Sequence, residues 1–424
     1  MKSRIEELVY ASGLWDGQQR LTHAVRLTPD AFVLSPPQLS SLLALGPAIV
    51  ECLGGLSRLM AIAASGELAT GSAWQLVREV MTAQVPRPFR ELQALRPRQI
   101  PRIVKVDFME DENGELKIAE IDAMNRRAMG YATLFAAARA LTKPELASFP
   151  GIPRSLAREL KNQGTKEAIL LYSERERFYR PEFNVLRSAL AAFGVTIHVV
   201  SEKEFSAGPG GFIAAGHPLP LATPLFSFPP LAESPELTVA LAELYRAGKL
   251  RLLLPPKPGL GSKGLLGLIS NPTQDQEIEA ILRSQVNASA LATVRAHLPA
   301  SYLVGKRLEL PPADKHYLLK EVVSAGTKGV LFSEDPGFAA ALTKAKLGTA
   351  TAILQEEVAQ RVRVFNSYAE GDAPCEGAWY TRLVVYFIAG APAEAVATGC
   401  QGKLVHGGKE ALEFGVGFQS ADKN

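Results

Sequence analysis

Cysteine is scarce in this sequence. Its 424 residues include only three cysteines, Cys52, Cys375 and Cys400, and no two of them have the CxxC spacing of a metal or redox motif. Three scattered cysteines are too few for a disulfide framework. We therefore expect a protein of a reducing compartment, the cytoplasm.

A strong net charge is also lacking. The 46 Lys and Arg residues nearly balance the 43 Asp and Glu residues, which leaves a formal net charge of +3 at pH 7. A nucleic-acid-binding protein usually carries a basic stripe or clustered lysines. We therefore expect no nucleic-acid partner.

The sequence has no uninterrupted apolar run of the length that a membrane span requires. Its most apolar region, residues 42–64, is interrupted by Pro47 and Glu51, which is typical of the buried helices of a folded protein. The first ten residues already contain charges of both signs, unlike a secretory signal. We expect neither a membrane span nor a secretory signal.

The chain length predicts two or three packed domains. Hydrophobic periodicity predicts a helical start, then two short alternating runs, then a strand–helix–strand unit of an open parallel sheet, and finally an α+β part. Within the third unit we expect a strand at 250–254 and a Gly/Pro-rich surface connection at 208–230. The fold class is thus α/β and α+β, multidomain, and the predicted units are residues 1–100, 101–164, 165–254 and 255–424.

The two alternating runs, IVKVDFM and ELKIAEI, flank the dipeptide Asn113-Gly114. Asn-Gly between such runs is the strongest short-range signal of a β-hairpin. With a two-residue loop, Asp107 lies directly opposite Glu120, and Lys105 lies opposite Asp122. Side chains alternate along strands, so the register predicts three carboxylates and one lysine in a single patch.

Such a patch needs an explanation, because like charges that face each other destabilise a sheet. A bound Mg²⁺ ion is one explanation, since it takes one or two carboxylates together with substrate phosphates. A solvated hairpin whose polar face meets water is the other. The spacing alone leaves both open.

Two lysines later in the chain are candidates for phosphate binding. Lys320 lies in the apolar run LLKEVV, where an ammonium group must reach water or meet an anion. Lys263 follows a Pro/Gly-rich stretch and begins an apolar helix-like run. The turn SAGTKG at 324–329 contains glycines that would let a loop fold over phosphates. A surface lysine, a routine helix-start lysine and an ordinary turn are the alternative interpretations, and no GxxxxGK[ST] loop occurs.

A further candidate is the run ILQEEV, an apolar strand that ends in two acids. Its backbone could contact an adenine base, with Glu356 or Glu357 binding a ribose hydroxyl or an amino group. The alternative is a strand that simply ends in solvent.

The order of these motifs resembles that of circularly permuted ATP-grasp ligases, and it is most similar to the glutathionylspermidine synthase-like branch. The shared order is a basic residue two positions before an aspartate, a hairpin, Glu-x-Asp, a lysine after a Pro/Gly stretch, a strand lysine, a Gly-rich loop and an acid-ended strand. The resemblance covers roughly residues 102–358. It implies an ATP-grasp fold of permuted order, with a helical N-terminal part and a Rossmann-like unit before the ATP-binding lobes.

The resemblance also implies roles for the hairpin. Asp107, Glu120 and Asp122 match the Mg²⁺ ligands of that family. Lys105 matches a catalytic position beside the transferred phosphate. The family usually has arginine at that position and asparagine in place of Asp122, so this sequence departs from the pattern twice.

ATP contacts are implied in the second half of the chain. Lys263 and Lys320 match the two lysines that bind the ATP phosphates in that family. The other matching positions are Ser324, Gly326, Lys328 and Gly329 in the loop above the triphosphate, and Gln355, Glu356, Glu357 and Val358 in the adenine-contacting hinge.

The implied activity is that of an ADP-forming carbon-nitrogen ligase that uses ATP and Mg²⁺. A carboxylate would be activated as an acyl phosphate, and an amine would then attack its acyl carbon. Small carboxylate and amine substrates are therefore the expected partners, and the N-terminal helices could cap the site or pair two subunits as a homodimer. Two alternatives stay open: a non-catalytic ATP-binding regulatory protein of the same fold, and a phosphotransferase on the same scaffold.

Overall fold

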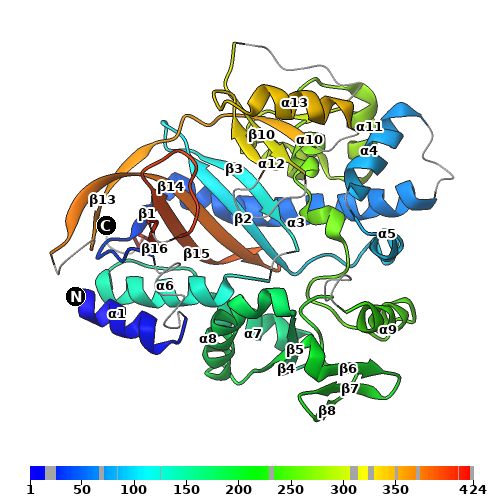
Figure 1. Cartoon of the computed structure of the whole chain (residues 1–424), viewed down its shortest axis with the longest axis horizontal. Coiled ribbons are helices and arrows are strands. Elements are labelled where there is room, and N and C mark those ends of the chain that lie inside the picture. Colours follow the sequence, from blue (N-terminus) through cyan, green and yellow to red (C-terminus); the bar gives the residue numbers. More distant parts are fainter. Residues whose placement is uncertain are drawn as a thin grey trace.

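A seven-stranded mixed sheet forms the centre of the protein, with helices on both of its faces (Figure 1). This computed structural model describes residues 1–14, 25–65, 71–83, 85–124, 126–228, 234–305, 314–322, 329–348, 352–368, 373–408 and 410–420. Six of its strands follow one another in the spatial order β1 (Phe32–Leu34), β16 (Leu412–Phe418), β15 (Ala391–Cys400), β14 (Cys375–Ile388), β2 (Ile103–Glu110) and β3 (Leu116–Asp122). The seventh strand, β13 (Val362–Ser367), lies off this path and pairs with β14. Neighbouring strands are antiparallel except β1 and β16.

The two faces of this sheet belong to two hydrophobic cores, as period-two alternation requires. One core joins side chains such as Val106, Phe108 and Val385 to a first set of helices. The other joins Val384 and Tyr386 to a second set. The first set is α3 (Pro36–Ser65), α4 (Ser72–Thr82), α10 (Gly264–Ser270), α11 (Gln276–Gln285) and α12 (Ala288–Ala296); the second is α1 (Lys2–Ala11), α6 (Met129–Thr142), α7 (Ile152–Asn162) and α8 (Arg180–Ala191).

Helix α3 is long and apolar enough to cross a membrane by length and composition, and 56% of its most apolar window is buried inside the protein. Its residues Leu42, Ile49 and Leu56 are at most 1% exposed and belong to the core that also contains the sheet residues Val106 and Phe108. The contacts are those of a core helix, in agreement with the interpretation of this region as buried helix.

A smaller antiparallel sheet lies beyond the β3 edge of the central sheet (Figure 1). Its order is β11 (Val330–Phe332), β10 (Tyr317–Glu321), β12 (Ala352–Glu356) and β9 (Ser301–Val304). Helix α13 (Phe338–Leu347) packs on one face around Leu319 and Leu354. The other face meets the first core through Ile353.

The segment 165–254 contains the expected strand–helix–strand unit. Strands β4 (Glu167–Tyr172) and β5 (Thr196–Ser201) are parallel and are connected through the short 3-10 helix η1 (Glu174–Tyr179) and α8. Single parallel bridges join Ile169 to Leu225 and Leu225 to Leu252. After β5 come η2 (Glu202–Glu204) and, further along the chain, α9 (Pro235–Arg246).

Two details of this segment were predicted wrongly. The strand expected at 250–254 is reduced to the bridge at Leu252. The supposed surface connection at 208–230 instead contains most of a three-stranded antiparallel sheet, β6 (Phe205–Gly208), β7 (Gly211–Ala214) and β8 (His217–Leu219). Its strands are three to four residues long, too short for an alternating pattern to be recognised in the sequence.

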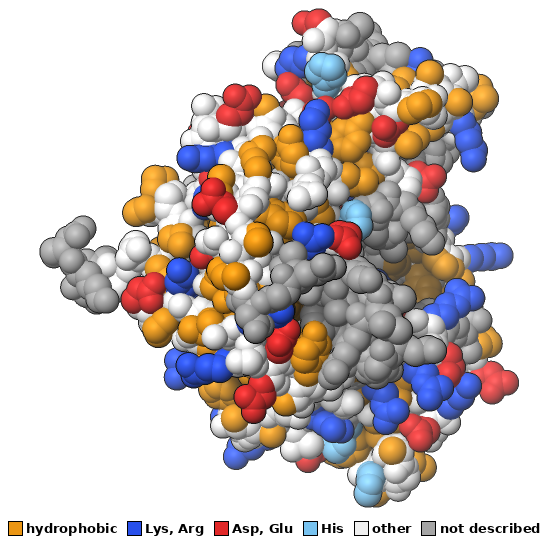
Figure 2. Space-filling view, turned by 60° about the vertical axis from the view of Figure 1, so that its left-hand side comes forward, with side chains coloured by type: hydrophobic (Ala, Val, Ile, Leu, Met, Phe, Trp, Pro, Cys, Tyr) orange, Lys and Arg blue, Asp and Glu red, His pale blue; other side chains and the backbone are white. Residues whose placement is uncertain are grey.

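The domain boundaries stay a prediction. The central sheet itself combines strands from the segments 1–100, 101–164 and 255–424. On the face drawn in Figure 2, basic and acidic side chains are scattered among apolar ones over the described part of the surface.

Candidate functional site

The hairpin β2–β3 brings the predicted side chains into register. In the strand register Asp107 lies opposite Glu120, and Lys105 lies opposite Asp122, as the sequence predicts. The loop, however, has three residues instead of two. The backbone N–H of Asp111 donates to the carbonyl of Glu115 at 2.9 Å, and Gly114 takes a φ of +83° between them, a conformation for which glycine is suited.

A β-bulge corrects this one-residue shift. Near the turn Phe108 pairs with Ile118, but beyond the irregularity Asp107 pairs with Glu120, so Ala119 is the extra residue. A bulge lets the following side chains exchange faces. Without it, Glu120 would point into the core and Ile121, which is 8% exposed, would point away from it. The predicted pairs are therefore correct because the longer loop and the bulge offset each other.

Basic side chains lie within ion-pair distance of two of the three acids, Asp107 and Glu120. The Lys105 Nζ is 2.7 Å from the Asp107 Oδ1, and an Arg382 Nη1 is 3.5 Å from the other oxygen of Asp107. The Lys263 Nζ is 3.1 Å from a Glu120 Oε1. Burial alone would raise the pKa of the Asp107 carboxyl, but Lys105, Arg382 and Lys263 together hold it below its ordinary value.

Asp122 differs from the other two acids. Among the described residues no ammonium or guanidinium group lies within ion-pair distance of it, and its Oδ1 accepts the Met124 N–H at 3.1 Å. Burial raises the pKa of its carboxyl, and the neighbouring charges of Glu120 and Asp107 raise it further, while Lys105 lowers it.

Lys320 reaches the same region from β10. Its side chain is 9% exposed, and its Nζ donates to the Gln355 Oε1 at 2.6 Å and to the carbonyl of Ala119, the bulge residue, at 3.2 Å. Gln355 is held in turn by donating to the Ser301 Oγ at 3.0 Å. Burial lowers the pKa of the Lys320 amine to about 8, and the two oxygens that accept its hydrogen bonds are both neutral.

The segment that carries Lys263 is fixed by groups that sequence reasoning missed. Helix α5 (Arg87–Ala94) ends beside the 3-10 helix η3 (Pro258–Gly261), and the fully buried Lys257 donates to the carbonyls of Gln93 and Leu95 at 2.8 and 3.0 Å. The Gln93 side chain also accepts the Gly259 N–H at 3.2 Å. The only sequence signal for Lys257 was its place within a Pro/Gly-rich stretch. The two carbonyls that it binds lie more than 150 residues earlier in the chain.

Gly259 must be glycine because of a close backbone approach. A Cβ added there would lie 2.4 Å from the carbonyl oxygen of Met81 and 2.6 Å from the Cε of Met60. Lys263 itself begins α10 as its N-cap residue, and its N–H donates to the carbonyl of Val322 at 2.9 Å. The backbone of Lys263 is thus tied to the end of β10.

Two arginines near the hairpin were also missed. Arg382 lies in β14, opposite Met109 of β2, and its signal was only a polar residue in an apolar strand. Arg126, which follows the end of β3, is 8% exposed, donates to the Ser227 Oγ at 2.6 Å and pairs with Glu176. It anchors the exit of the hairpin to the β4–β5 unit.

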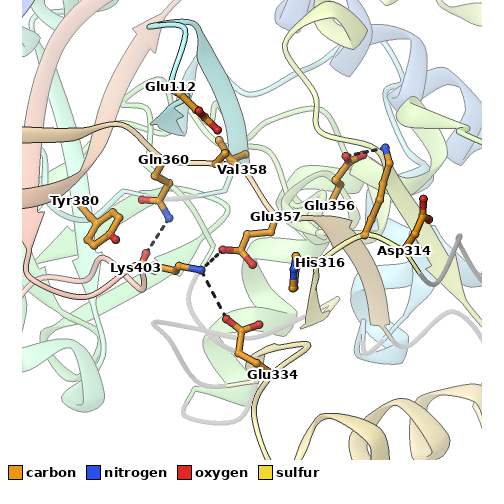
Figure 3. Close-up of a pocket in the computed structure, with 12 residues that line it drawn as sticks. Glu112, Asp314, His316, Glu334, Glu356, Glu357, Val358, Gln360, Tyr380 and Lys403 are labelled. Atoms are coloured by element: carbon orange, nitrogen blue, oxygen red, sulfur yellow. Dashed lines mark hydrogen bonds and ion pairs between the residues drawn. The ribbon is translucent and has the colours of Figure 1, made fainter.

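The predicted hinge residues divide between two sides of β12. Gln355 faces Lys320, whereas Glu356, Glu357 and Val358 line a cavity of about 550 Å³ (Figure 3). Both acids are already paired, Glu356 with Lys315 at 2.8 Å and Glu357 with Lys403 at 2.7 Å. The remaining lining residues include Glu112 at the tip of the hairpin, Tyr380 of β14, His316 just before β10 and Glu334 just after β11.

The predicted phosphate loop lies mostly outside the described residues. Ser324, Gly326 and Lys328 belong to the undescribed segment 323–328. Gly329 is described, with a φ of +75°, and its carbonyl accepts the Glu321 N–H at 3.1 Å. Strands β10 and β11 are antiparallel, with Lys320 opposite Val330, so this segment connects two paired strands as the sequence suggested.

The donor set of the hairpin fits a hard divalent cation, because carboxylate oxygens are the ligands that Mg²⁺ uses together with phosphates. Asp122 has no basic group within ion-pair distance among the described residues, which leaves one carboxylate of the set available to such an ion. A second group of acids, Glu334 and Glu357 with His316, has ligand atoms within 4.8 Å of one another in the described part of the chain. Lys403 already pairs with both acids of that group, at 2.7 Å from Glu357 and 3.7 Å from Glu334 (Figure 3).

Comparison with solved structures finds a similar fold in a glutathione synthetase-like effector from Globodera pallida in its apoform. The TM-score is 0.59, the match covers 98% of this chain and 95% of that chain, and the sequence identity is 11%. The chain therefore has a fold similar to that of this glutathione synthetase-like effector. At this identity the likeness shows the fold alone.

A second match is a protein of Methylobacillus flagellatus KT with a provisional assignment as a gamma-glutamylcysteine synthetase. It covers 84% of this chain and 85% of that chain at 10% identity, and its TM-score of 0.39 is too low to carry an argument. No protein-family model matches the sequence, and a search of curated proteins finds no match either. The glutathione synthetase-like fold therefore rests on the comparison of structures.

Proposed function

We propose that the protein is an ATP-dependent ligase that joins a carboxylate to an amine through an acyl phosphate and releases ADP and phosphate. The observation that carries the proposal is the hairpin register, which pairs Asp107 with Glu120 and Lys105 with Asp122 within reach of Lys263. The glutathione synthetase-like fold supports it. So does Lys320, whose amine is held against the bulge of the same hairpin.

The acids of the hairpin would hold Mg²⁺. Asp107 and Glu120 face each other across β2 and β3, and Asp122 follows on the same face. The ion, when bound, supplies neutralisation of charge on the β- and γ-phosphates of ATP. Catalysis of phosphoryl transfer consists mainly of positioning and charge stabilisation.

The lysines would position the nucleotide. Lys263 and Lys320 would orient its α- and β-phosphates, because both amines are buried against the hairpin and their backbones are tied to neighbouring strands. Lys105 would stabilise charge on the transferred group. Arg382, whose guanidinium lies 3.5 Å from Asp107, would add positive charge beside the same acids. The loop Ser324–Gly329 would close over the phosphates and exclude water.

The hinge residues Glu356, Glu357 and Val358 would contact adenine from the cavity that they line. Among the described residues the Val358 N–H has no partner, which leaves a backbone donor for a base. The order of the motifs further supports a circularly permuted member of the fold, similar to the glutathionylspermidine synthase-like branch. In that arrangement the β4–α8–β5 segment would be the Rossmann-like unit.

The first test is isothermal titration with a non-hydrolysable ATP analogue, with and without Mg²⁺. We expect Mg²⁺ to strengthen binding to the wild-type protein, and Asp107→Ala to lose that enhancement while its thermal unfolding stays cooperative. Glu115→Ala is the matched control, because Glu115 is an exposed acid of the same hairpin and pairs only locally with Lys117.

The proposal fails if the analogue does not bind under either condition. If it binds, carboxylate and amine pairs are then screened for ADP release. A phosphorylated product that persists without any amine would point instead to a phosphotransferase, and binding with no ADP release across the panel would point to a regulatory protein.

A further inference from the structure

The acids of the candidate metal site already have internal counter-ions. Lys105 lies 2.7 Å from Asp107, and Lys263 lies 3.1 Å from Glu120. Neither ammonium is freely hydrated, since the side chains of Lys105 and Lys263 are only 15% and 6% exposed. The amines thus occupy positions beside the oxygens that a metal ion would have to coordinate.

Positive charge exceeds negative charge among these groups. The acids are Asp107, Glu120 and Asp122, and the basic groups around them are Lys105, Lys263, Lys320 and Arg382. A divalent cation that arrives alone therefore meets a region of net positive charge. It would also have to displace ammonium groups from their carboxylates, and a buried ammonium without an anion is costly.

A triphosphate changes this balance. It brings several negative charges, so an ammonium that leaves a carboxylate can pair with a phosphate oxygen, and the carboxylate becomes available to the metal. The backbone of Lys263 is fixed as the N-cap of α10 and by its hydrogen bond to Val322. In this exchange the side chain of Lys263 would rotate from Glu120 toward the phosphates while its backbone stays in place.

We propose that Lys263, assisted by Lys105, is an internal counter-ion that keeps free divalent metal off the hairpin and makes metal binding conditional on the nucleotide. This inference rests on the proposed function, because it assigns the hairpin acids to the metal and the lysine to the phosphates. It adds a coupling between the two ligands. Metal enters the site together with the nucleotide and is excluded when the nucleotide is absent.

The experiment measures Mn²⁺ binding without nucleotide, from the electron paramagnetic resonance signal of free Mn²⁺. We expect weak binding to the wild-type protein and roughly tenfold tighter binding to Lys263→Met, a change equivalent to about 1.4 kcal/mol. Lys105→Met should shift affinity in the same direction, and it serves as the second variant if the first does not fold. Adding Glu120→Gln to Lys263→Met should remove the gain.

Lys117→Met is the matched control, because Lys117 lies on β3, the strand of Glu120, and pairs with Glu115 near the turn of the hairpin. It should bind Mn²⁺ like the wild-type protein. Equal Mn²⁺ affinity in the wild type, Lys263→Met and Lys105→Met would overturn the inference. Tight Mn²⁺ binding by the wild-type protein without nucleotide would overturn it as well.

The two proposals fail in distinguishable ways. If a non-hydrolysable ATP analogue binds to the wild type with Mg²⁺ but Mn²⁺ affinity is independent of both lysines, the proposed function stands and the counter-ion role is wrong. If the analogue does not bind at all, the proposed function is lost, and with it the coupling.

Discussion

Replacing Lys257 by methionine should change how stability depends on pH. The side chain is fully buried and donates to two backbone carbonyls, and burial lowers the pKa of its amine from an ordinary 10.5 to about 8. At about 1.4 kcal/mol per pKa unit, this difference means that keeping the amine charged costs the folded state about 3 kcal/mol more than it costs the unfolded state.

The direction follows from proton counting. Below pH 8 the amine is protonated in both the folded and the unfolded state. Between pH 8 and 10.5 the unfolded chain holds a proton that the folded chain has released, so the free energy of unfolding of the wild type rises with pH. The methionine variant has no such group. Stability of the wild type relative to the variant should therefore increase by up to about 3 kcal/mol across this interval.

The assay is urea unfolding of both proteins at pH 7 and pH 10, with the midpoints compared at each pH. Other groups that titrate in this range cancel in the difference between the two proteins. Lys249→Met, at an exposed lysine, is the control and should follow the wild type. If the midpoints of the wild type and Lys257→Met shift by the same amount between the two pH values, the amine has an ordinary pKa and the reasoning is refuted.

Two further substitutions test packing around the site. Gly259→Ala places a Cβ 2.4 Å from the carbonyl oxygen of Met81, so we expect the free energy of unfolding, measured by urea denaturation, to fall by about 2 kcal/mol. Gly210→Ala is the control and should change this free energy little, because a Cβ at Gly210 has no atom within 4 Å. The Arg363 guanidinium lies 2.6 and 2.8 Å from the two carboxylate oxygens of Glu110. Glu110→Gln removes this buried anion, so we expect the free energy of unfolding to fall by about 3 kcal/mol and the melting temperature to fall with it. An unchanged melting temperature would contradict this reasoning.

Much of the candidate site could be predicted because it lies in one hairpin. Alternation along two short strands and the Asn-Gly signal predict that Asp107 faces Glu120, and the structure confirms this pairing. The loop length was predicted wrongly, since Asp111 accepts the N–H groups of Asn113 and Glu115 and favours a three-residue loop. Only the bulge at Ala119 restores the predicted pairs.

The partners of the lysines could not be predicted in the same way. Lys320 was recognised as a charge in an apolar strand, but its contact with the carbonyl of Ala119 joins residues 201 positions apart. Arg382 had no motif at all, and its position beside Asp107 depends on the pairing of β14 with β2. The three-stranded sheet at 205–219 was missed because strands of three or four residues carry no periodic signal.

The sequence by itself determined the elements that depend on local periodicity: the buried helix α3, the hairpin β2–β3 and the parallel β4–α8–β5 unit. In each, the repeat of apolar residues along neighbouring positions decides which face is buried. Only the tertiary structure decided which charges meet. The ion pairs of Lys263 and Arg382 and the buried amine of Lys257 join distant segments, and their free energies depend on the burial that packing creates, which no local pattern encodes.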